Sequence, residues 1–417
     1  MWIKKTIAPR SRRDFLRTGL YGVGVSAALP AFFQQLGFAQ AAKALDGAPE
    51  THPSRILVVL ELSGGNDGLN TVVPYADDAY YKARPTLGVR ANKVLKLDDH
   101  FGLHPSCPGL HSLFKEGHLA IVHGCGYPNP NLSHFTAMEW WHTGVPNGSD
   151  KYGWLGRFAD AQWPVAPQNG IVNIGSRQSR ALASARQTPL VFGDPKKFGR
   201  LGTDAEQKVF ETFGKTYPTG NPSLEFVNGV SHAATAGAVL VRNACSEYRA
   251  LADYGSDNDL TLNLKKVAAL ISAGLPTRIF YLNMGGFDTH AAQSDHHQIL
   301  LIYLADALRG FLTDLKKMGR ADDVAVMVFT EFGRRVRENA SKGTDHGTAT
   351  PMFVIGHQVK GGFYGQPPAL TNLDDGNLKM TTDFRSVYAT LLQGWMGFGP
   401  TGSILKGEFA PLPIFVS

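Results

Sequence analysis

Aspartate and histidine side chains occur together in glycine-rich turns of this chain. In the turn GGFDTH, one residue separates Asp288 from His290, so both side chains can point the same way if the turn is extended. The segment GTDH supplies a second pair, Asp345 and His346. Carboxylate oxygen combined with imidazole nitrogen suits Zn²⁺, Mn²⁺ or Fe²⁺ better than Ca²⁺ or Mg²⁺. These turns therefore predict a divalent metal site, which could lower the pKa of a bound water or hydroxyl and polarise a phosphoryl oxygen.

Two more acidic residues follow apolar segments in the same way. Asp67 lies in the turn SGGND, and Glu331 lies in the segment TEFG. Each such residue alone has a structural alternative, because aspartate and histidine in these turns often cap helices or close the turn. The set as a whole, placed at successive strand ends, favours a functional site.

Ser133 is the candidate nucleophile, with His134 beside it as the second catalytic candidate. The pair follows a PNPN turn and precedes a predicted helix, and helix N-termini bind anions through their free N–H groups. The alternative is that Ser133 only caps this helix. Arg334 and Arg335 also have two interpretations, contact with an anionic ligand or pairing with surface acids.

Short apolar segments bounded by glycine-rich turns predict the strands that position these residues. They cover residues 56–62, 119–123, 278–283, 323–329 and 351–355. A long amphipathic helix is predicted before Gly319, and another over about residues 383–395. Alternating strands and helices predict an α/β fold with a mainly parallel central sheet and helices on both faces. Ligands bind at the carboxyl edge of such sheets.

The chain is expected to divide into a short leader, a linker and one large domain. Residues 42–54 are small and polar and read as the linker, and residues 55–417 form the α/β domain. Within it, about residues 145–260 carry many Gly, Pro and Asn with a weaker pattern, which predicts a loop-rich insertion with some helix around Ala236–Leu251.

Residues 1–41 have the order of a twin-arginine signal peptide. Arg12 and Arg13 stand in the pattern S-R-R-x-F-L, a weakly apolar stretch follows, and Ala39-Gln40-Ala41 offers a cleavage site. The stretch contains glycine and proline and is too weakly apolar for a stable membrane anchor. We therefore expect the twin-arginine translocase as a partner during export, and a periplasmic or secreted mature protein.

The charge of the chain is concentrated in this leader. The full chain has 41 basic and 35 acidic residues, a net charge of +6. Six basic residues and one acidic residue lie in residues 1–41, so the remainder is close to +1. The basicity therefore gives no argument for a nucleic-acid partner.

Five motifs in order resemble the bacterial family catalogued as domain of unknown function 1501. The resemblance extends from about Ser54 to the C-terminus and rests on LSGGNDGLNTVVPY, GYPNPNLSHFTAM, GGFDTH, FTEFGRRVRENAS and GTDHGTA. That family resembles a remote branch of the alkaline phosphatase and sulfatase superfamily. The resemblance implies an alkaline-phosphatase-like sheet, two metal ions at its carboxyl edge, and a Ser, Thr or modified Cys nucleophile.

The resemblance also implies roles for single residues. Asp67, Asp288, His290, Glu331 and His346, with Asp345 beside it, would be the metal ligands, and Ser133 would be the nucleophile. Phe332 stands where the superfamily has a ligand, which puts a second metal in doubt. The sulfatase signature Cys-x-Pro-Ser-Arg is absent from the sequence.

Two functions follow as expectations. The first is an exported metal-dependent hydrolase that acts on a small anionic phosphate or sulfate ester, with Zn, Mn or Fe as the cofactor. The second is a non-catalytic member that binds an envelope component or a partner protein.

Overall fold

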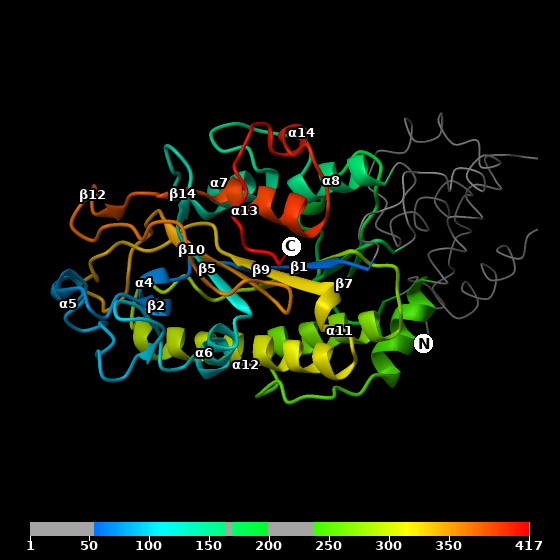
Figure 1. The fold of residues 1–417 in the computed structure, drawn as a ribbon, viewed down its shortest axis with the longest axis horizontal. Helices are drawn as coiled ribbons and strands as arrows, with labels where there is room; N and C mark the ends of the chain where they lie inside the picture. The colour runs from blue at the N-terminus through cyan, green and yellow to red at the C-terminus, as the bar shows by residue number, and fades with distance from the viewer. Residues whose placement is uncertain (1–53, 164–168, 199–236, 417) are drawn as a thin grey trace, which may run out of the picture. The chain divides into compact units, whose positions relative to one another are not determined.

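The computed structural model describes residues 54–163, 169–198 and 237–416 (Figure 1). The chain divides into two compact units, one of residues 46–190 with 248–417 and one of residues 1–45 with 191–247. The predicted signal peptide and nearly all of the predicted linker lie outside the described residues. In the smaller unit, the described residues 237–247 are helical, where some helix was predicted. All that follows concerns the larger unit.

A central sheet organises the larger unit. The order of its strands is β11-β5-β10-β9-β1-β8-β6, with β14 pairing with β5. The strands are β1 (Ile56–Leu62), β5 (Leu119–Gly126), β6 (Ile171–Ile174), β8 (Ile279–Met284), β9 (Val324–Phe329), β10 (Thr350–Gly356), β11 (Gly362–Tyr364) and β14 (Thr382–Asp383). All pairs among them are parallel except those of β10, which runs antiparallel to β5 and β9. The predicted α/β class with a mainly parallel sheet is confirmed.

The apolar segments form strands because both faces of the sheet are covered. Every residue of β1 is buried, and so is every residue of β5 and β9. A strand that is buried on both faces needs continuous rather than alternating apolar residues. This is why the continuous apolar segments in the sequence located these strands with little error.

Helices lie on both sides of the sheet in Figure 1. On one side are α6 (Pro108–Lys115), α11 (Asp259–Ser272) and α12 (Gln293–Lys317), and on the other are α7 (His134–Thr143), α8 (Trp154–Gln162), α13 (Phe384–Thr390) and α14 (Gly402–Leu405). Large aromatic side chains fill the second interface, where Trp141 stacks on Phe384 and Trp154 stacks on Tyr388. The helix predicted over residues 383–395 is α13 continued by the π-helix η3 (Leu391–Trp395).

Part of the segment predicted as a loop-rich insertion belongs to the central sheet. Strand β6 pairs in parallel with β8, and α8 packs into the same apolar core as β6. The 3-10 helix η1 (Arg180–Leu182) follows, and then strand β7 (Leu190–Phe192), where the chain passes from the larger unit into the smaller one. β6 has only four residues, and the glycine and proline around it concealed its pattern in the sequence.

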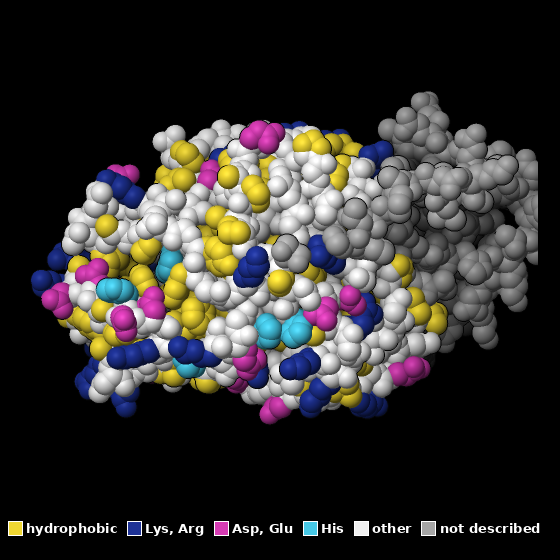
Figure 2. Space-filling model, in the orientation of Figure 1, with side chains coloured by type: hydrophobic (Ala, Val, Ile, Leu, Met, Phe, Trp, Pro, Cys, Tyr) yellow, Lys and Arg dark blue, Asp and Glu magenta, His cyan; other side chains and the backbone are white. Residues whose placement is uncertain are grey.

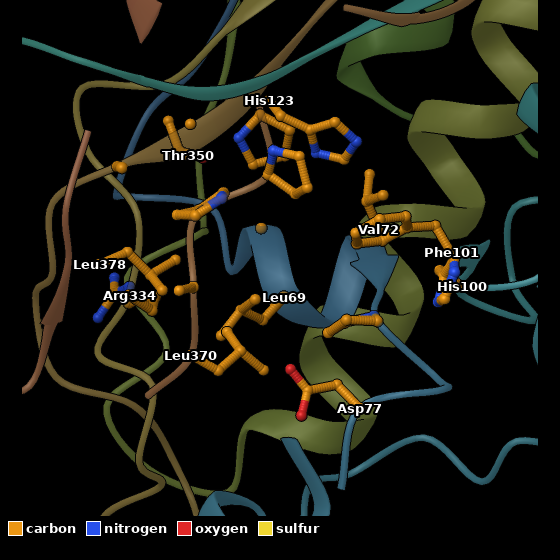
Figure 3. Close-up of a pocket in the computed structure, with 18 of the residues that line it drawn as sticks. Leu69, Val72, Asp77, His100, Phe101, His123, Arg334, Thr350, Leu370 and Leu378 are labelled. Carbon is orange, nitrogen blue, oxygen red and sulfur yellow. The ribbon is translucent and has the colours of Figure 1, made fainter. Parts of the chain in front are cut away.

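Small elements extend the carboxyl edge. They are α4 (Gly68–Thr71), β2 (Val72–Val73), α5 (Asp78–Ala83), β3 (Leu95–Lys96), β4 (Gly102–Leu103), β12 (Leu373–Asp374) and β13 (Asn377–Leu378). The 3-10 helix η2 (Ala321–Asp323) lies instead at the amino end of β9. A cavity of about 600 Å³ lies against α4, β2 and β5. Apolar side chains gather over this region in Figure 2, and Figure 3 shows the cavity itself. No helix in the described parts of the chain combines the length and apolar character needed to cross a membrane.

Candidate functional site

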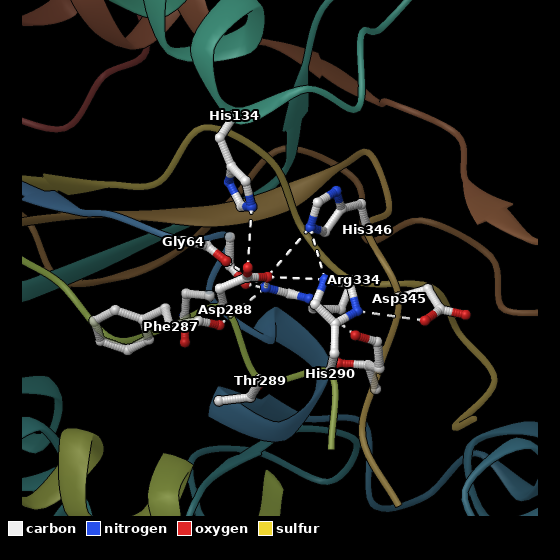
Figure 4. Close-up of polar contacts among 12 residues, drawn as sticks. Gly64, His134, Phe287, Asp288, Thr289, His290, Arg334, Asp345 and His346 are labelled. Carbon is white, nitrogen blue, oxygen red and sulfur yellow. Dashed lines mark hydrogen bonds and ion pairs between the residues drawn. The ribbon is translucent and has the colours of Figure 1, made fainter. Parts of the chain in front are cut away.

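Five chain segments bring polar residues to one edge of the sheet (Figure 4). The turns after β1, β8 and β9 carry Asp67, Asp288 and Glu331, and α7 begins at His134. The segment with His346 precedes β10 instead of following it. Because β10 is antiparallel to its neighbours, its beginning lies at the edge where the parallel strands end. The sequence therefore predicted this convergence, although it did not reveal the direction of β10.

The turns after β1 and β8 are packed tightly together. Gly64 has φ of +118°, and a Cβ atom there would lie 2.5 Å from the backbone nitrogen of Asp288. The N–H of Phe287 donates to the carbonyl of Ser63 at 3.2 Å. Only glycine combines this backbone conformation with so close an approach. The glycines in this turn thus fix the position of Asp288.

Asp288 is the centre of the polar cluster. Its Oδ1 lies 2.9 Å from Nε2 of His290, 3.2 Å from Nε2 of His346 and 2.8 Å from Nη2 of Arg334. Its Oδ2 lies 3.4 Å from Nε2 of His134. Partial burial raises the pKa of Asp288, but the hydrogen bond and the positive charge of Arg334 outweigh it and lower the pKa to about 2. The carboxylate is therefore ionised at neutral pH.

His134 is held by a buried carboxylate. Its Nδ1–H donates to Oε1 of Glu331 at 2.7 Å, and Glu331 is only 2% exposed. This hydrogen bond is the main reason why the pKa of His134 is raised. Nε2 of His134 is buried and has no hydrogen-bond partner among the described residues. Glu331 itself also accepts from the N–H of Gly64 and the hydroxyl of Thr330, so its oxygens already have partners within the chain.

The other two histidines have the same orientation. Nδ1–H of His346 donates to the carbonyl of Leu132 at 2.8 Å, which leaves Nε2 without a proton when the ring is neutral. Burial lowers the pKa of His346 and favours that neutral ring. Nδ1 of His290 lies 3.4 Å from Oδ1 of Asp345, and its Nε2 lies 2.9 Å from Nε2 of His346.

The arrangement suits a metal ion. Metal-bound histidines commonly donate their second ring N–H to a carboxylate or a backbone carbonyl, which orients the ring. Atoms bonded to one ion at about 2.1 Å lie about 3.0–3.4 Å apart. Oδ1 of Asp288 and the Nε2 atoms of His290 and His346 have mutual distances of 2.9, 2.9 and 3.2 Å. His134, Asp288 and His346 form a group whose ligand atoms all lie within 4.8 Å of one another.

Arg334 ties the site together. Its side chain is fully buried and donates to the carbonyls of Gly64, Gly65, Thr344 and Phe287 as well as to Asp288. The guanidinium therefore joins three turns and neutralises part of the charge of Asp288. Sequence reasoning left its function open, because a buried arginine and a surface arginine look alike in a sequence.

Phe332 packs against two of the histidines. Its ring centroid lies 4.9 Å from that of His134 and 4.8 Å from that of His346. Phe332 and Glu331 also line a small cavity of about 180 Å³ with Tyr127, Trp141 and Lys379. An apolar ring thus occupies the position for which the resemblance implied a ligand.

Three predicted site residues have other surroundings. The carboxylate of Asp67 is fully buried and pairs with Arg84 at 2.5 Å. Asp345 lies outside the cluster, mostly exposed, and contacts His290 and Asn339. Ser133 is exposed and occupies the N-cap position of α7, yet its hydroxyl makes no capping hydrogen bond within the described part of the chain.

Residues 54–405 match the family described as "Protein of unknown function (DUF1501)". The chain belongs to this family. The match covers the described part of the larger unit almost to its end, and it confirms the resemblance seen in the five motifs. No curated protein matches the chain in sequence.

Solved structures show distant similarity. A protein in the alkaline phosphatase superfamily from Vibrio parahaemolyticus is 13% identical over 88% of this chain and 76% of that one, with a TM-score of 0.37. The lipoteichoic acid synthase LtaP from Listeria monocytogenes is 9% identical over 75% and 66%, with a TM-score of 0.32, so this chain spans slightly under two thirds of that one. The C-terminal periplasmic domain of EcEptC from Escherichia coli is 10% identical over 85% and 86%, with a TM-score of 0.37.

Proposed function

We propose that this chain is an exported hydrolase of small phosphate or sulfate esters that uses one divalent metal ion. His134, Asp288 and His346 would hold the ion, with His290 beside them. The observation that carries the proposal is the shared orientation of the three imidazoles. Each Nδ1 faces an oxygen of the chain, and each Nε2 faces Asp288.

The unpartnered Nε2 of His134 supports a bound ion. A buried polar atom without a partner costs about 1–3 kcal/mol, and native proteins seldom leave one unsatisfied. This nitrogen lies 3.4 Å from Asp288, too far for a good hydrogen bond, on the side where the other Nε2 atoms converge. A cation would satisfy it and would also separate the closely spaced nitrogens of His290 and His346.

Each residue of the site would have its own role in ester hydrolysis. A divalent ion at these ligands would polarise an ester oxygen and lower the pKa of a bound hydroxyl. Ser133 would attack the phosphorus or sulfur atom, the alcohol would leave, and water would release the acid from the serine. Glu331 would keep His134 in its tautomer, and Arg334 would fix Asp288. The free N–H groups at the start of α7 would favour the anionic ester.

The test combines metal content with turnover. Protein purified without chelators or a metal column is analysed by elemental mass spectrometry and assayed on phosphate and sulfate esters. We expect about one equivalent of Zn, Mn or Fe and measurable turnover on at least one ester. Ser133→Ala should abolish turnover and leave both metal content and the unfolding temperature unchanged.

Ser294→Ala is the matched control for this variant. Ser294 is an exposed serine in the first turn of α12, and its loss should change neither turnover nor metal content. Full turnover in Ser133→Ala would show that Ser133 is not the nucleophile.

The second candidate is a non-catalytic protein that binds a metal ion or an envelope component. Phe332 packed between two histidines favours it, because this ring removes a ligand position. The exposed hydroxyl of Ser133 favours it as well, because no hydrogen bond from the described part of the chain activates it. Bound metal without turnover across the whole ester panel would select this candidate.

Export through the twin-arginine translocase is part of the proposal. Arg12 and Arg13 lie outside the described residues, and the proposal rests on their sequence pattern. Replacing both with lysine should retain the uncleaved chain in the cytoplasm, as fractionation and immunoblotting would show. Unchanged export of the double variant would refute this route.

A further inference from the structure

The cavity of about 600 Å³ lies beside the candidate metal site, and of the site residues described above only Arg334 lines it. Its walls come mainly from α4, β2 and the segment around residues 367–370, and they are rich in leucine, valine and proline. Proline fixes its own backbone φ, so this wall is stiff. A volume of this size, with mostly apolar walls, is typical of cavities that bind small molecules.

His123 is the polar group inside the cavity. It lies on β5, is 6% exposed, and packs against Phe101 and Phe363, whose ring centroids lie 4.8 Å and 4.9 Å from that of the imidazole. The two phenylalanine rings lie only 5.6 Å from each other, so they pack together on one side of the imidazole. Neither ring nitrogen forms a hydrogen bond with any residue that the structure describes, yet neither is sealed from solvent. Burial lowers the pKa of His123 to about 4, so the ring is neutral and offers one donor and one acceptor.

The charged groups around the cavity are unevenly placed. Figure 3 shows Asp77 reaching in from the side opposite His123, with Leu69 and Leu370 between them. Asp78 lies next to Asp77 and is exposed. Arg334 lines the cavity too, but its side chain has no exposed surface and its guanidinium is engaged with backbone carbonyls and Asp288. The charge that a ligand meets here is therefore negative.

We propose that this cavity is a second binding site, for a small, mainly apolar molecule that carries an uncharged hydrogen-bonding group towards His123 and no negative charge. The proposed ester substrate of the metal site is anionic, and the two carboxylates near the cavity would repel it. The two sites thus select opposite kinds of ligand, and the cavity does not depend on metal chemistry.

Two fluorescent probes with nearly the same rings test the selection by charge. N-phenyl-1-naphthylamine is uncharged and has one N–H group, whereas 8-anilino-1-naphthalenesulfonate adds a sulfonate. The titrations use the folded protein with and without a chelator. We expect the uncharged probe to bind one equivalent, the sulfonate to bind at least about tenfold more weakly, and the chelator to have no effect. Tenfold corresponds to about 1.4 kcal/mol.

Variants locate the binding. Leu69→Trp fills the centre of the cavity and should weaken binding of the uncharged probe at least about tenfold, while His123→Leu should weaken it several-fold through the lost hydrogen bond. Leu262→Trp is the matched control, because Leu262 is an exposed leucine of α11, on a helix that does not line the cavity. It should leave binding unchanged.

Ala369→Trp replaces Leu69→Trp if circular dichroism shows that the latter is unfolded, because Ala369 is exposed and lines the cavity. The proposal is overturned if the wild-type protein does not bind the uncharged probe, if both probes bind equally, or if a folded cavity-filling variant binds as well as Leu262→Trp.

Discussion

Asp67 and Asp288 occupy comparable places and have opposite surroundings. Each follows a parallel strand of the central sheet in a glycine-rich turn, Asp67 after β1 and Asp288 after β8. The Asp67 side chain has no exposed surface and pairs with the equally buried Arg84. The Asp288 side chain is 48% exposed and faces three histidine Nε2 atoms.

The difference lies in how many carboxylate oxygens are left available for a further ligand. Asp67 also accepts from the side chain of Gln293 and from the N–H of Asn70, where it caps α4. Its oxygens are fully used inside the protein, so an ion would have to displace Arg84. Asp288 keeps Oδ2 without a close partner within the described structure, 3.4 Å from His134.

The largest expected effect is loss of stability in Asp67→Asn. The change leaves the charge of Arg84 buried without its partner, which typically costs about 3–5 kcal/mol in the free energy of unfolding. Urea unfolding followed by circular dichroism measures this loss. Metal content per folded molecule should remain at the wild-type value. A stable variant that lacks metal would instead make Asp67 a ligand.

Asp375→Asn is the control, because it breaks the pair of Asp375 with Arg335 at the surface, where Asp375 is 89% exposed. It should change the free energy of unfolding by less than about 1 kcal/mol.

The pH dependence of the stability gives a second check on Asp67. Burial raises the pKa of Asp67, but the charge of Arg84 outweighs it, and the net shift is downward. The stability from Asp67 is thus present above the ordinary carboxyl pKa and is lost as the pH falls below about 4. Wild-type stability should fall more steeply there than that of Asp67→Asn.

Asp288→Asn should have the converse effect. The neutral amide removes the charge on which all three imidazoles converge, so we expect metal affinity to fall at least about 100-fold, or about 2.7 kcal/mol. The free energy of unfolding should fall less, by about 1–2 kcal/mol, because Arg334 retains its backbone carbonyl acceptors. Titration of the metal-free protein with Zn²⁺ under competition from a chelator measures the affinity. Wild-type affinity in Asp288→Asn would exclude this cluster as the metal site.

The fold was predictable because the sheet is covered on both faces. The apolar segment of a strand such as β9 is short enough to favour a strand over a helix, and the glycine-rich turns marked its end. Strand direction was not predictable for β10, since periodicity is the same in parallel and antiparallel strands. The short β6 was missed because four residues carry too little pattern.

The site was predictable to the level of the converging turns and no further. Residue type and position placed Asp67 and Asp288 in the same category, and only the long-range packing of Arg84 on Asp67 separates them. Glu331 was expected as a ligand, yet its oxygens have partners within the chain, including His134. Such contacts join residues far apart in the sequence, so spacing along one chain cannot reveal them.

The smallest expected effect belongs to Glu331→Gln, which keeps the shape of the side chain and removes its charge. Glu331 orients His134 through the hydrogen bond to its Nδ1, the ring nitrogen that faces away from the proposed ion. Loss of such a partner usually lowers metal affinity about 10–100-fold. Its hydrogen bond is also the main cause of the raised pKa of His134, so that pKa should fall in the metal-free variant, as NMR titration of the imidazole would show. Glu139→Gln is the control. Glu139 lies on α7, the helix that begins at His134, but it pairs with Arg180 and is 37% exposed. If affinity falls as far as in Asp288→Asn while the pKa of His134 is unchanged, Glu331 binds the ion directly, and the contrast between buried and ligating carboxylates would apply to Asp67 alone.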